Sequence, residues 1–259
     1  MRDLKIGSVD QMIQQPPLIF ESSNEYEILT KVMNPLYERL VEFNDVLPNG
    51  TVEVVARQMA LVPIQPFLDF NGIRKSNKKY IAKELDWYLS QDLSIKGHVD
   101  DIKIWNLCCT KDERKEVNSN YGYLLFNEEN GSQYDNCLDV LLKDKTSRNA
   151  IIVYNRPSIY DEYTRDGMHD MICTMFSHFM IRHNALYMIH VMRSNDLIFG
   201  FMNDFAWTCF VYQNMYSDLK DKYPKLEIGR IFWQSDSMHV YERHFELLKK
   251  IVGSYKERI

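Results

Sequence analysis

Two apolar runs separated by a two-residue turn constrain the fold of this chain more than any other feature. Met171–Arg182 and Ala185–Arg193 are rich in residues that favour strands, and His183–Asn184 lies between them. Runs of this kind, joined so closely, are typical of neighbouring strands in one sheet. The sequence therefore predicts a sheet built around this pair of strands.

Further strands and helices are predicted on both sides of this pair. The continuous apolar run Ala150–Tyr154 predicts a strand that is buried on both faces. Other strands are expected at Thr51–Val62 and Gly229–Trp233. Helical spacing occurs in Asn24–Phe43, which Pro35 should break or kink, and in Asn77–Leu93, Phe205–Lys220 and His239–Tyr255, whereas Glu113–Asn130 is polar and irregular. This mixture predicts an α/β or α+β domain with a mixed sheet packed against helices.

Composition places further bounds on the chain. Its 259 residues, of which 45% are hydrophobic, are sufficient for one substantial core. The sequence has no repeat, no low-complexity tract and no linker rich in proline, glycine or serine. We therefore expect a single domain over residues 1–259.

Several classes of function are excluded at this stage. No run approaches the roughly 18 apolar residues of a membrane-spanning helix, and Met1–Gln15 is too polar for a signal peptide. Five cysteines without paired spacing indicate reduced thiols in a cytoplasmic compartment. A net charge of −5 gives no electrostatic footprint for nucleic acid. We find no metal-ligand spacing and no phosphate-binding glycine loop, so no metal is expected.

Cys173, in the stretch HDMICTMF, is a candidate nucleophile with an ordinary alternative. Free cysteine is most often a small buried apolar residue, and the local sequence favours that interpretation. A second alternative pairs Cys173 with His169 as the thiolate dyad of a cysteine hydrolase. A spacing of four residues would bring the two side chains together on a helix, but not on the strand predicted here.

Polar groups also interrupt two segments that are both predicted to be buried. In MRSNDLIFGFMND, the residues Arg193–Asp196 precede an apolar patch, and Gly200 is expected to permit a turn before Asp204. In MHVYERHF, His239 and Tyr241 alternate before a helix, which would put both on one face of a strand end. Neither stretch is a specific motif when taken alone.

Eight blocks of the sequence are far more specific together than any one of them. They are KELDWYLS, KIWN, NSNYGY, QYDNCL, SRNAIIVYNRPS, DGMHDMICT, MRSNDLIFGFMNDFAW and MHVYERHF. In this order, from Asn77 to Phe245, they resemble the thymidylate synthase superfamily, and are most similar to its deoxycytidylate hydroxymethylases from bacterial viruses. Residues 1–76 match only weakly. The resemblance implies a thymidylate synthase-like fold, a one-carbon transferase and a homodimer that forms sheet to sheet.

The resemblance assigns chemistry to four residues. Cys173 matches the nucleophile that adds as a thiolate to carbon 6 of a pyrimidine and so makes carbon 5 nucleophilic. Because a thiol with a pKa of about 8.5 is mostly protonated at neutral pH, it needs a cation beside it. Arg193 matches the family arginine that lies near both this cysteine and the substrate phosphate. Glu84 matches a glutamate that organises water and proton transfer, and Tyr121 matches a tyrosine that assists removal of the proton from carbon 5.

Substrate recognition is implied at further positions. The phosphate of a pyrimidine deoxynucleoside monophosphate would be bound by Arg193, Ser194 and Arg148, the last reaching into the partner subunit's site. The chain departs from the family here, because Asn149 follows Arg148 where a second arginine is usual. His239 and Tyr241 match the pair that holds the sugar 3′-hydroxyl.

The implied co-substrate is 5,10-methylenetetrahydrofolate. Trp105 and Asp196 match family positions that contact the folate, Trp105 by stacking and Asp196 by hydrogen bonds to the pterin. After transfer of the one-carbon unit, water would give a hydroxymethyl group and a hydride would give a methyl group. No single residue of the sequence decides between water and hydride.

The choice of base is implied by Asp204. Thymidylate synthases have asparagine four residues after the glycine of this block, and here that position is Asp204, as in the deoxycytidylate enzymes. A protonated carboxyl can donate to the ring nitrogen of cytosine and accept from its amino group. Cys173–Thr174 replaces the Cys-His of the synthases, and His178–Phe179 replaces their Gln-Phe.

The resemblance therefore predicts a deoxycytidylate 5-hydroxymethyltransferase that is encoded by a virus that modifies its own DNA precursors and that acts in the host cytoplasm. Three alternatives share its mechanism: deoxyuridylate hydroxymethylase, deoxycytidylate methylase and thymidylate synthase. A catalytically silent nucleotide-binding relative, suggested by Asn149, is an alternative of another class.

Overall fold

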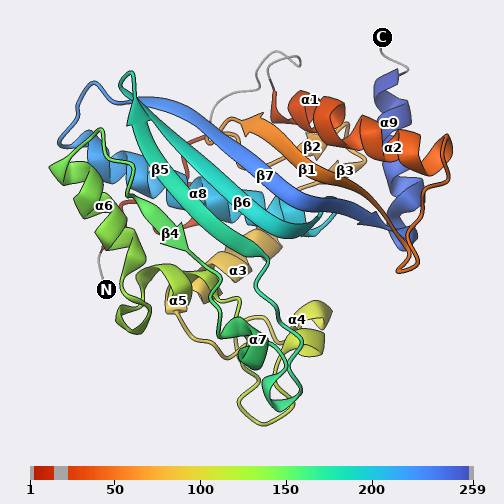
Figure 1. The fold of residues 1–259 in the computed structure, drawn as a ribbon, viewed down its shortest axis with the longest axis horizontal. Helices are drawn as coiled ribbons and strands as arrows, with labels where there is room; N and C mark the ends of the chain where they lie inside the picture. The colour runs from red at the N-terminus through yellow and green to blue at the C-terminus, as the bar shows by residue number, and fades with distance from the viewer. Residues whose placement is uncertain (1–2, 15–22, 257–259) are drawn as a thin grey trace.

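The fold is an α+β arrangement around a mixed five-stranded sheet (Figure 1). The computed structural model describes residues 3–14 and 23–256, so 1–2, 15–22 and 257–259 of the predicted domain lie outside the described residues. The sheet has the order β1-β7-β6-β5-β4, in which β6 and β7 are parallel and the other neighbours are antiparallel. Its strands are β1 (Thr51–Leu61), β4 (Ile151–Val153), β5 (Thr174–Arg182), β6 (Ala185–Asp196) and β7 (Glu227–Tyr241). A separate two-stranded sheet consists of β2 (Asp69–Phe70) and β3 (Arg74–Lys75).

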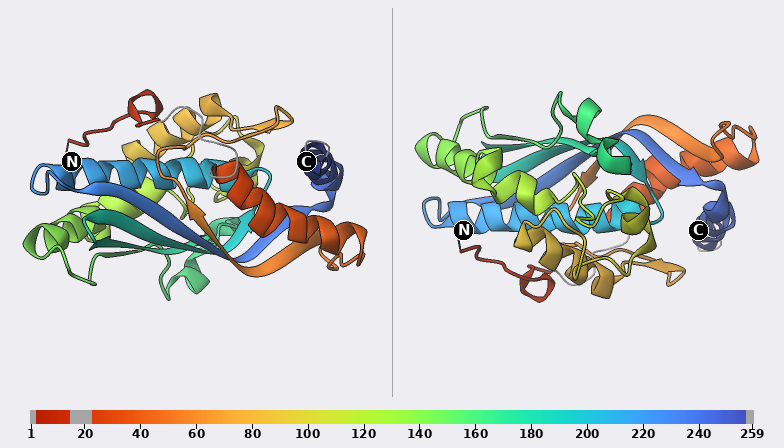
Figure 2. Two further views of the ribbon diagram at one scale, coloured as in Figure 1. Left: turned by 90° about the horizontal axis from the view of Figure 1, so that it is seen from above. Right: turned by 90° about the horizontal axis from the view of Figure 1, so that it is seen from below.

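Helix α8 lies along one face of this sheet, and α3 and the N-terminal segment lie further out on the same side (Figure 2). The α-helices are α1 (Asn24–Ile28), α2 (Asn34–Val41), α3 (Lys78–Ser90), α4 (Lys103–Cys108), α5 (Tyr121–Phe126), α6 (Gln133–Lys143), α7 (Ile159–Glu162), α8 (Gly200–Lys220) and α9 (Phe245–Lys256). A π-helical turn, η3 (Leu29–Met33), and short 3₁₀ turns, η1 (Val9–Gln11), η4 (Glu128–Asn130), η5 (Arg165–Gly167) and η6 (Glu242–His244), complete the set. In the part of the chain that the structure describes, no helix is long and apolar enough to cross a membrane.

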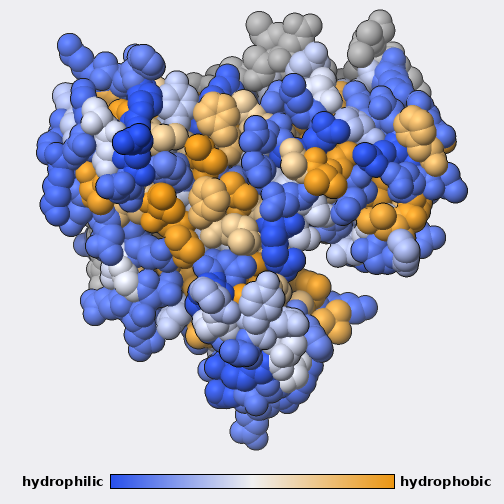
Figure 3. All heavy atoms as spheres, in the orientation of Figure 1, coloured by the Kyte–Doolittle hydropathy of each residue, from blue (hydrophilic) through white to orange (hydrophobic). Residues whose placement is uncertain are grey.

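The two faces of the sheet differ in exposure. One row of paired residues across the five strands is buried on the side of α8: Ile152, Ser177, His190, Trp233 and Met59. The next row lies on the opposite face and is at least partly exposed: Ile151, His178, Ile189, Phe232 and Ala60. Figure 3 shows apolar side chains gathered over the strands on this second face, which we call the open face. The core therefore lies between the sheet and α8.

The strand pair that most constrained the fold is confirmed. β5 and β6 pair antiparallel, and His183 and Asn184 between them both have positive φ values, 50° and 62°. This is the backbone of a tight two-residue hairpin turn. The predicted kink near Pro35 is also found, because the π-helical turn Leu29–Met33 accommodates a proline that lacks a backbone N–H.

Several boundaries were predicted wrongly. Ala150–Tyr154 is not buried on both faces: β4 is an edge strand, and Ile151 and Val153 are 43% and 50% exposed. β7 continues far beyond Gly229–Trp233, because ladders to β1 and β6 on both sides support its polar middle. The last helix begins only at Phe245, so the earlier part of His239–Tyr255 is strand and a 3₁₀ turn.

Two further predictions failed locally. Glu113–Asn130 is not irregular throughout, since it contains α5, where a Cβ on Gly122 would lie 1.7 Å from the carbonyl oxygen of Tyr88. This close approach of α5 to α3 requires glycine and is invisible to helical periodicity. Gly200 does not make the predicted turn: it is the first residue of α8, without a positive φ, and the turn precedes it.

Candidate active site

Cys173 lies directly before β5, beside Arg193 of the neighbouring strand β6. The backbone N–H of Arg193 donates to the carbonyl oxygen of Cys173 at 2.9 Å, and its Nη2 lies 3.6 Å from the sulfur. The guanidinium also donates to two loop carbonyls, from Nε to Ile172 at 3.0 Å and from Nη2 to Met171 at 2.7 Å. These bonds fix the cation next to the thiol, as the sequence predicted.

The thiol of Cys173 is nevertheless protonated at neutral pH in this state. Burial raises its pKa to about 11, and the positive charge of Arg193 only partly opposes this rise. The nearby carboxylates Asp204 and Asp170 raise it further. The cation beside the thiol therefore lowers the pKa of Cys173 without outweighing the effect of burial.

Asp204 faces Asn195 across the turn between β6 and α8. The side-chain Nδ2 of Asn195 donates to Oδ2 of Asp204 at 2.8 Å. Burial raises the pKa of Asp204 to about 8, the negative charges of Glu84 and Asp196 add to the rise, and the bond from Asn195 opposes it. At neutral pH this group is mainly a neutral carboxylic acid, which can both donate and accept a hydrogen bond.

Glu84 is a second buried acid, held on α3 by a chain of hydrogen bonds. Nε1 of Trp105 donates to the hydroxyl of Tyr80 at 3.0 Å, and that hydroxyl donates to Oε1 of Glu84 at 2.7 Å. Burial raises the pKa of Glu84 to about 7, although the bonds from Tyr80 and Trp105 oppose the rise. A carboxyl that titrates near neutral pH is suited to accept and return a proton.

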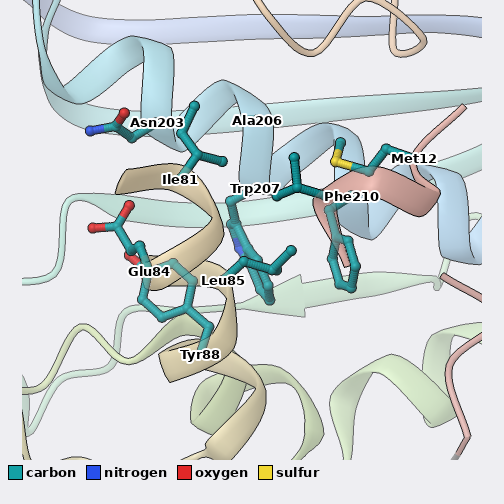
Figure 4. Close-up of a pocket in the computed structure, with 10 residues that line it drawn as sticks. Met12, Ile81, Glu84, Leu85, Tyr88, Asn203, Ala206, Trp207 and Phe210 are labelled. Atoms are coloured by element: carbon teal, nitrogen blue, oxygen red, sulfur yellow. The ribbon is translucent and has the colours of Figure 1, made fainter. Parts of the chain in front are cut away.

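Aromatic rings surround these two acids. Figure 4 shows Glu84 and Tyr88 on α3 beside Trp207 on α8, and the rings of Tyr88 and Trp207 are 5.0 Å apart. The ring of Tyr121, at the start of α5, lies 5.4 Å from the ring of Tyr88 between their centroids. Burial raises the pKa of Tyr121, and the charges of Asp204 and Cys173 contribute to the rise. The predicted residues Glu84, Tyr121, Cys173 and Asp204 are thus in one electrostatic environment.

The strand ends of β6 and β7 bring a second predicted group together. Asp196 pairs with His239 in the parallel ladder, and the backbone N–H of Leu197 donates to the carbonyl oxygen of His239 at 3.0 Å. The rings of His239 and Tyr241 are 5.1 Å apart and nearly perpendicular. Ser194 is partly exposed on β6, opposite Ser237 of β7. Ser194 and Asp196 lie on β6 and not in a polar interruption after the strand, whereas His239 and Tyr241 lie at the end of a strand, as their alternation predicted.

Asp170 anchors the loop before Cys173 and was missed by the sequence. Its Oδ2 accepts from the backbone N–H groups of Asn118 and Ser119, each at 2.7 Å, and its Oδ1 accepts from the hydroxyl of Ser119 at 2.7 Å. No local pattern links residues that are more than 50 positions apart. Tyr80, also missed, could have been found, because it precedes Glu84 by four residues on a predicted helix.

The structure does not place Arg148 or His169 beside Cys173. Arg148 is exposed, and the register of Ile151 with His178 directs the chain before β4 away from the start of β5, where Cys173 lies. His169 is exposed on the loop, where helical spacing to Cys173 does not apply. The geometry therefore gives no support to the cysteine hydrolase dyad.

Comparisons with known proteins give a consistent result. A family described as thymidylate synthase matches residues 37–257. The deoxycytidylate 5-hydroxymethyltransferase of Enterobacteria phage T4 is 38% identical over 201 residues, which cover 76% of this chain and 78% of the relative. The protein of the same name from Enterobacteria phage T6 gives the same values. A putative thymidylate synthase of Methanocaldococcus jannaschii is 27% identical over 124 residues, covering 48% of this chain and 54% of that protein.

Proposed function

Because the chain belongs to the thymidylate synthase family, we propose that it is a deoxycytidylate 5-hydroxymethyltransferase. The reaction transfers a one-carbon unit from 5,10-methylenetetrahydrofolate to carbon 5 of dCMP, and water completes the hydroxymethyl group. Two phage relatives, each 38% identical to this chain, carry this name.

The specific choice of dCMP is supported by the phage relatives and by the protonated state of Asp204, which suits the edge of cytosine. Burial raises the pKa of this carboxyl to about 8, so that it carries a proton at neutral pH. The acid can then donate to the unprotonated ring nitrogen of cytosine and accept from the exocyclic amino group. The same acid could satisfy uracil with its proton on the other oxygen, so the choice of base also depends on which oxygen of Asp204 carries the proton.

Covalent catalysis is assigned to Cys173. Loss of the thiol proton and attack of the sulfur on carbon 6 form a carbon–sulfur bond and leave carbon 5 as the nucleophile. The positive charge of Arg193, 3.6 Å from the sulfur, favours the thiolate that this step requires. Glu84 and Tyr121 are the candidates for moving protons at the base, with Tyr121 directed to the proton on carbon 5. Elimination of the sulfur releases the product and restores the thiol.

The residues near Asp196 have the chemistry that a folate needs. One carboxylate oxygen of Asp196 accepts from the backbone N–H of Ile198 at 3.0 Å. The ring of Phe199 is 47% exposed, with the guanidinium of Arg74 above it at 4.5 Å and the ring of His244 at 4.7 Å. An acceptor for pterin N–H groups, an aromatic surface and cations for glutamate carboxylates are thus adjacent. We assign Trp105 and Asp196 to the folate, which supplies the one-carbon unit when bound.

We assign the phosphate and the sugar of the substrate to residues at the ends of β6 and β7. Nε and Nη2 of Arg193 are bonded to the loop, and among the described residues none accepts from its Nη1, which suits a phosphate oxygen. Ser194 lies next to it, and His239 and Tyr241 are assigned to the 3′-hydroxyl. Arg148 would reach the phosphate bound by the partner subunit.

A homodimer that packs through the open face supports this assignment of Arg148. Phe232 is 43% exposed there and stacks on Tyr187 at 6.0 Å, and Ile151 and Val153 extend the apolar surface to the edge of the sheet. An uncovered apolar surface of this kind is typical of a subunit interface. We further propose one domain over residues 1–259 and a cytoplasmic location, since the structure has all five cysteines as free thiols.

The test is to incubate the protein with dCMP, dUMP and methylenetetrahydrofolate and to identify the nucleotide product by mass. A hydroxymethyl group on dCMP is expected. A methylated product, or turnover of dUMP alone, would overturn the proposed reaction. In a Cys173→Ser variant, loss of turnover with retained dCMP binding would exclude a catalytically silent binding protein.

A further inference from the structure

Asn195 is a buried polar residue to which the reaction above gives no role. It lies between the phosphate and folate candidates on β6 and is 3% exposed. Its Nδ2 donates to Oδ2 of Asp204, whereas its Oδ1 is buried and has no partner among the residues that the structure describes. A buried carbonyl oxygen without a donor is costly, and a ligand can supply the missing hydrogen bond.

A protonated carboxyl alone does not distinguish cytosine from uracil. Cytosine requires a donor opposite its ring nitrogen and an acceptor opposite its amino group. Uracil requires the reverse, an acceptor opposite its ring N–H and a donor opposite its carbonyl. A carboxylic acid satisfies either base, depending on which of its two oxygens carries the proton. The selectivity of Asp204 therefore depends on what fixes that proton.

Asn195 is positioned to fix which oxygen of Asp204 carries the proton. Because Nδ2 donates to Oδ2 of Asp204 at 2.8 Å, Oδ2 is favoured as the unprotonated acceptor and the proton is favoured on Oδ1. We propose that Asn195 is the residue that makes Asp204 specific for cytosine, by holding Oδ2 as an acceptor toward the exocyclic amino group. The free Oδ1 of Asn195 is a further acceptor on this side, suited to an amino group and not to the carbonyl of uracil. This inference rests on the proposed function.

Gly200 leaves room for this arrangement. A Cβ at this position would lie 3.6 Å from Oδ2 of Asp204 and 3.7 Å from Nδ2 of Asn195. Glycine at position 200 therefore packs over the hydrogen bond between Asn195 and Asp204. It has no side chain that could form a competing hydrogen bond with either residue. The contact is held from both ends by regular structure, β6 for Asn195 and α8 for Asp204.

The experiment compares Asn195→Leu with Thr208→Val in the full chain. Leucine has a similar size but no donor, whereas Thr208 is a matched control because its hydroxyl bonds the backbone oxygen of Asp204 at 2.7 Å and not its carboxyl. Dissociation constants of dCMP and dUMP are measured by calorimetry. We expect the dCMP preference to fall about tenfold or more in Asn195→Leu, as for the loss of one buried hydrogen bond, and to stay within about twofold in Thr208→Val.

A second variant keeps the test decisive if Asn195→Leu does not fold. Asn195→Asp has the same shape, and its two adjacent carboxyls would hold a shared proton to higher pH than Asp204 alone, so that the pH at which dCMP binding weakens should rise relative to the wild type. An unchanged dCMP preference in Asn195→Leu, or an unchanged pH profile in Asn195→Asp, would overturn the role of Asn195. A wild-type protein without dCMP preference would instead overturn the proposed function.

Discussion

Arg193 contacts Cys173 in two ways, through a backbone hydrogen bond of 2.9 Å between the strands and through a guanidinium nitrogen 3.6 Å from the sulfur. The first contact fixes the position of the cysteine, and the second acts on its ionisation. Burial still dominates, since the pKa of the thiol is raised to about 11. The candidate nucleophile is therefore largely protonated at neutral pH.

Replacing Arg193 with methionine should make Cys173 less reactive. The positive charge lowers the pKa of the thiol, so its removal should raise that pKa, and each unit reduces the thiolate fraction at neutral pH about tenfold. The measurement is the rate of iodoacetamide alkylation against pH, followed on the peptide that contains Cys173. Cys173→Ser is the control for the assigned peptide. An unchanged rate in the Arg193 variant would show that the cation does not govern the thiol.

Asp204→Asn should shift the preference toward dUMP. An asparagine amide that is oriented to donate to the carbonyl of uracil and to accept from its ring N–H meets cytosine with its polar atoms mismatched, at a cost on the order of 1–3 kcal/mol. The ratio of dCMP to dUMP turnover should therefore fall by at least about tenfold. Asp218→Asn, further along α8, is the matched control and should keep the wild-type ratio. An unaltered ratio in Asp204→Asn would refute its role in choosing the base.

Asp204 and Glu84 should make the fold less stable as the pH rises from about 4 to about 8, whereas buried His190, whose pKa is lowered to about 3, acts in the opposite direction below about pH 6.5. The pKa values of Asp204 and Glu84 are raised in the folded state, to about 8 and about 7, so the folded chain binds more protons than the unfolded chain in this range. The contribution of these two carboxyls to the free energy of unfolding then falls with pH, by about 1.4 kcal/mol for each unit of raised pKa, and the histidine contribution cancels when wild type and Asp204→Asn are compared. Urea denaturation of wild type and Asp204→Asn at pH 5 and pH 8 tests this, and the variant should show the smaller loss. Equal losses would contradict the raised pKa of Asp204.

Gly122→Ala should destabilise the fold near the site. The added Cβ would lie 1.7 Å from the carbonyl oxygen of Tyr88, so that α5 and α3 must separate, at a cost of about 1–3 kcal/mol or more. Gly253→Ala is the matched control, because it is also helical and has open space around it. That control should gain about 0.5–1 kcal/mol of stability. Urea unfolding that affects both variants equally would contradict the close approach of the two helices.

Much of the candidate site could be predicted because the eight sequence blocks that carry the family resemblance contain its residues. Cys173 directly precedes β5, Arg193 lies near the end of β6, and Glu84 is on α3. The contact of Asn195 with Asp204 could not be predicted, since it depends on how the turn between β6 and α8 orients them. The raised pKa of Cys173 is likewise a property of burial, which requires the packed structure.

The strand boundaries failed for a different reason. The middle of β7 contains Gln234–Ser237, whose polarity gives no strand signal, yet hydrogen bonds to β1 and β6 extend through it. For β4, the apolar sequence predicts burial but does not identify what covers the strand. The exposure of Ile151 and Val153 suggests that part of that burial comes from another copy of the chain.

Two inactive variants should restore activity when they are mixed, if Arg148 acts in the partner subunit's site. Cys173→Ser removes the nucleophile, and Arg148→Gln removes the arginine that is exposed and directed away from Cys173 of its own chain. In a mixed dimer, one site combines an intact Cys173 with an intact Arg148 from the other chain. Random mixing should therefore recover about a quarter of the wild-type activity. Phe232→Glu in both chains should prevent this recovery by placing charges on the open face, and sedimentation should then show monomers. If Arg148 acts within its own chain, the mixture would be no more active than its components, because neither chain then carries a complete site.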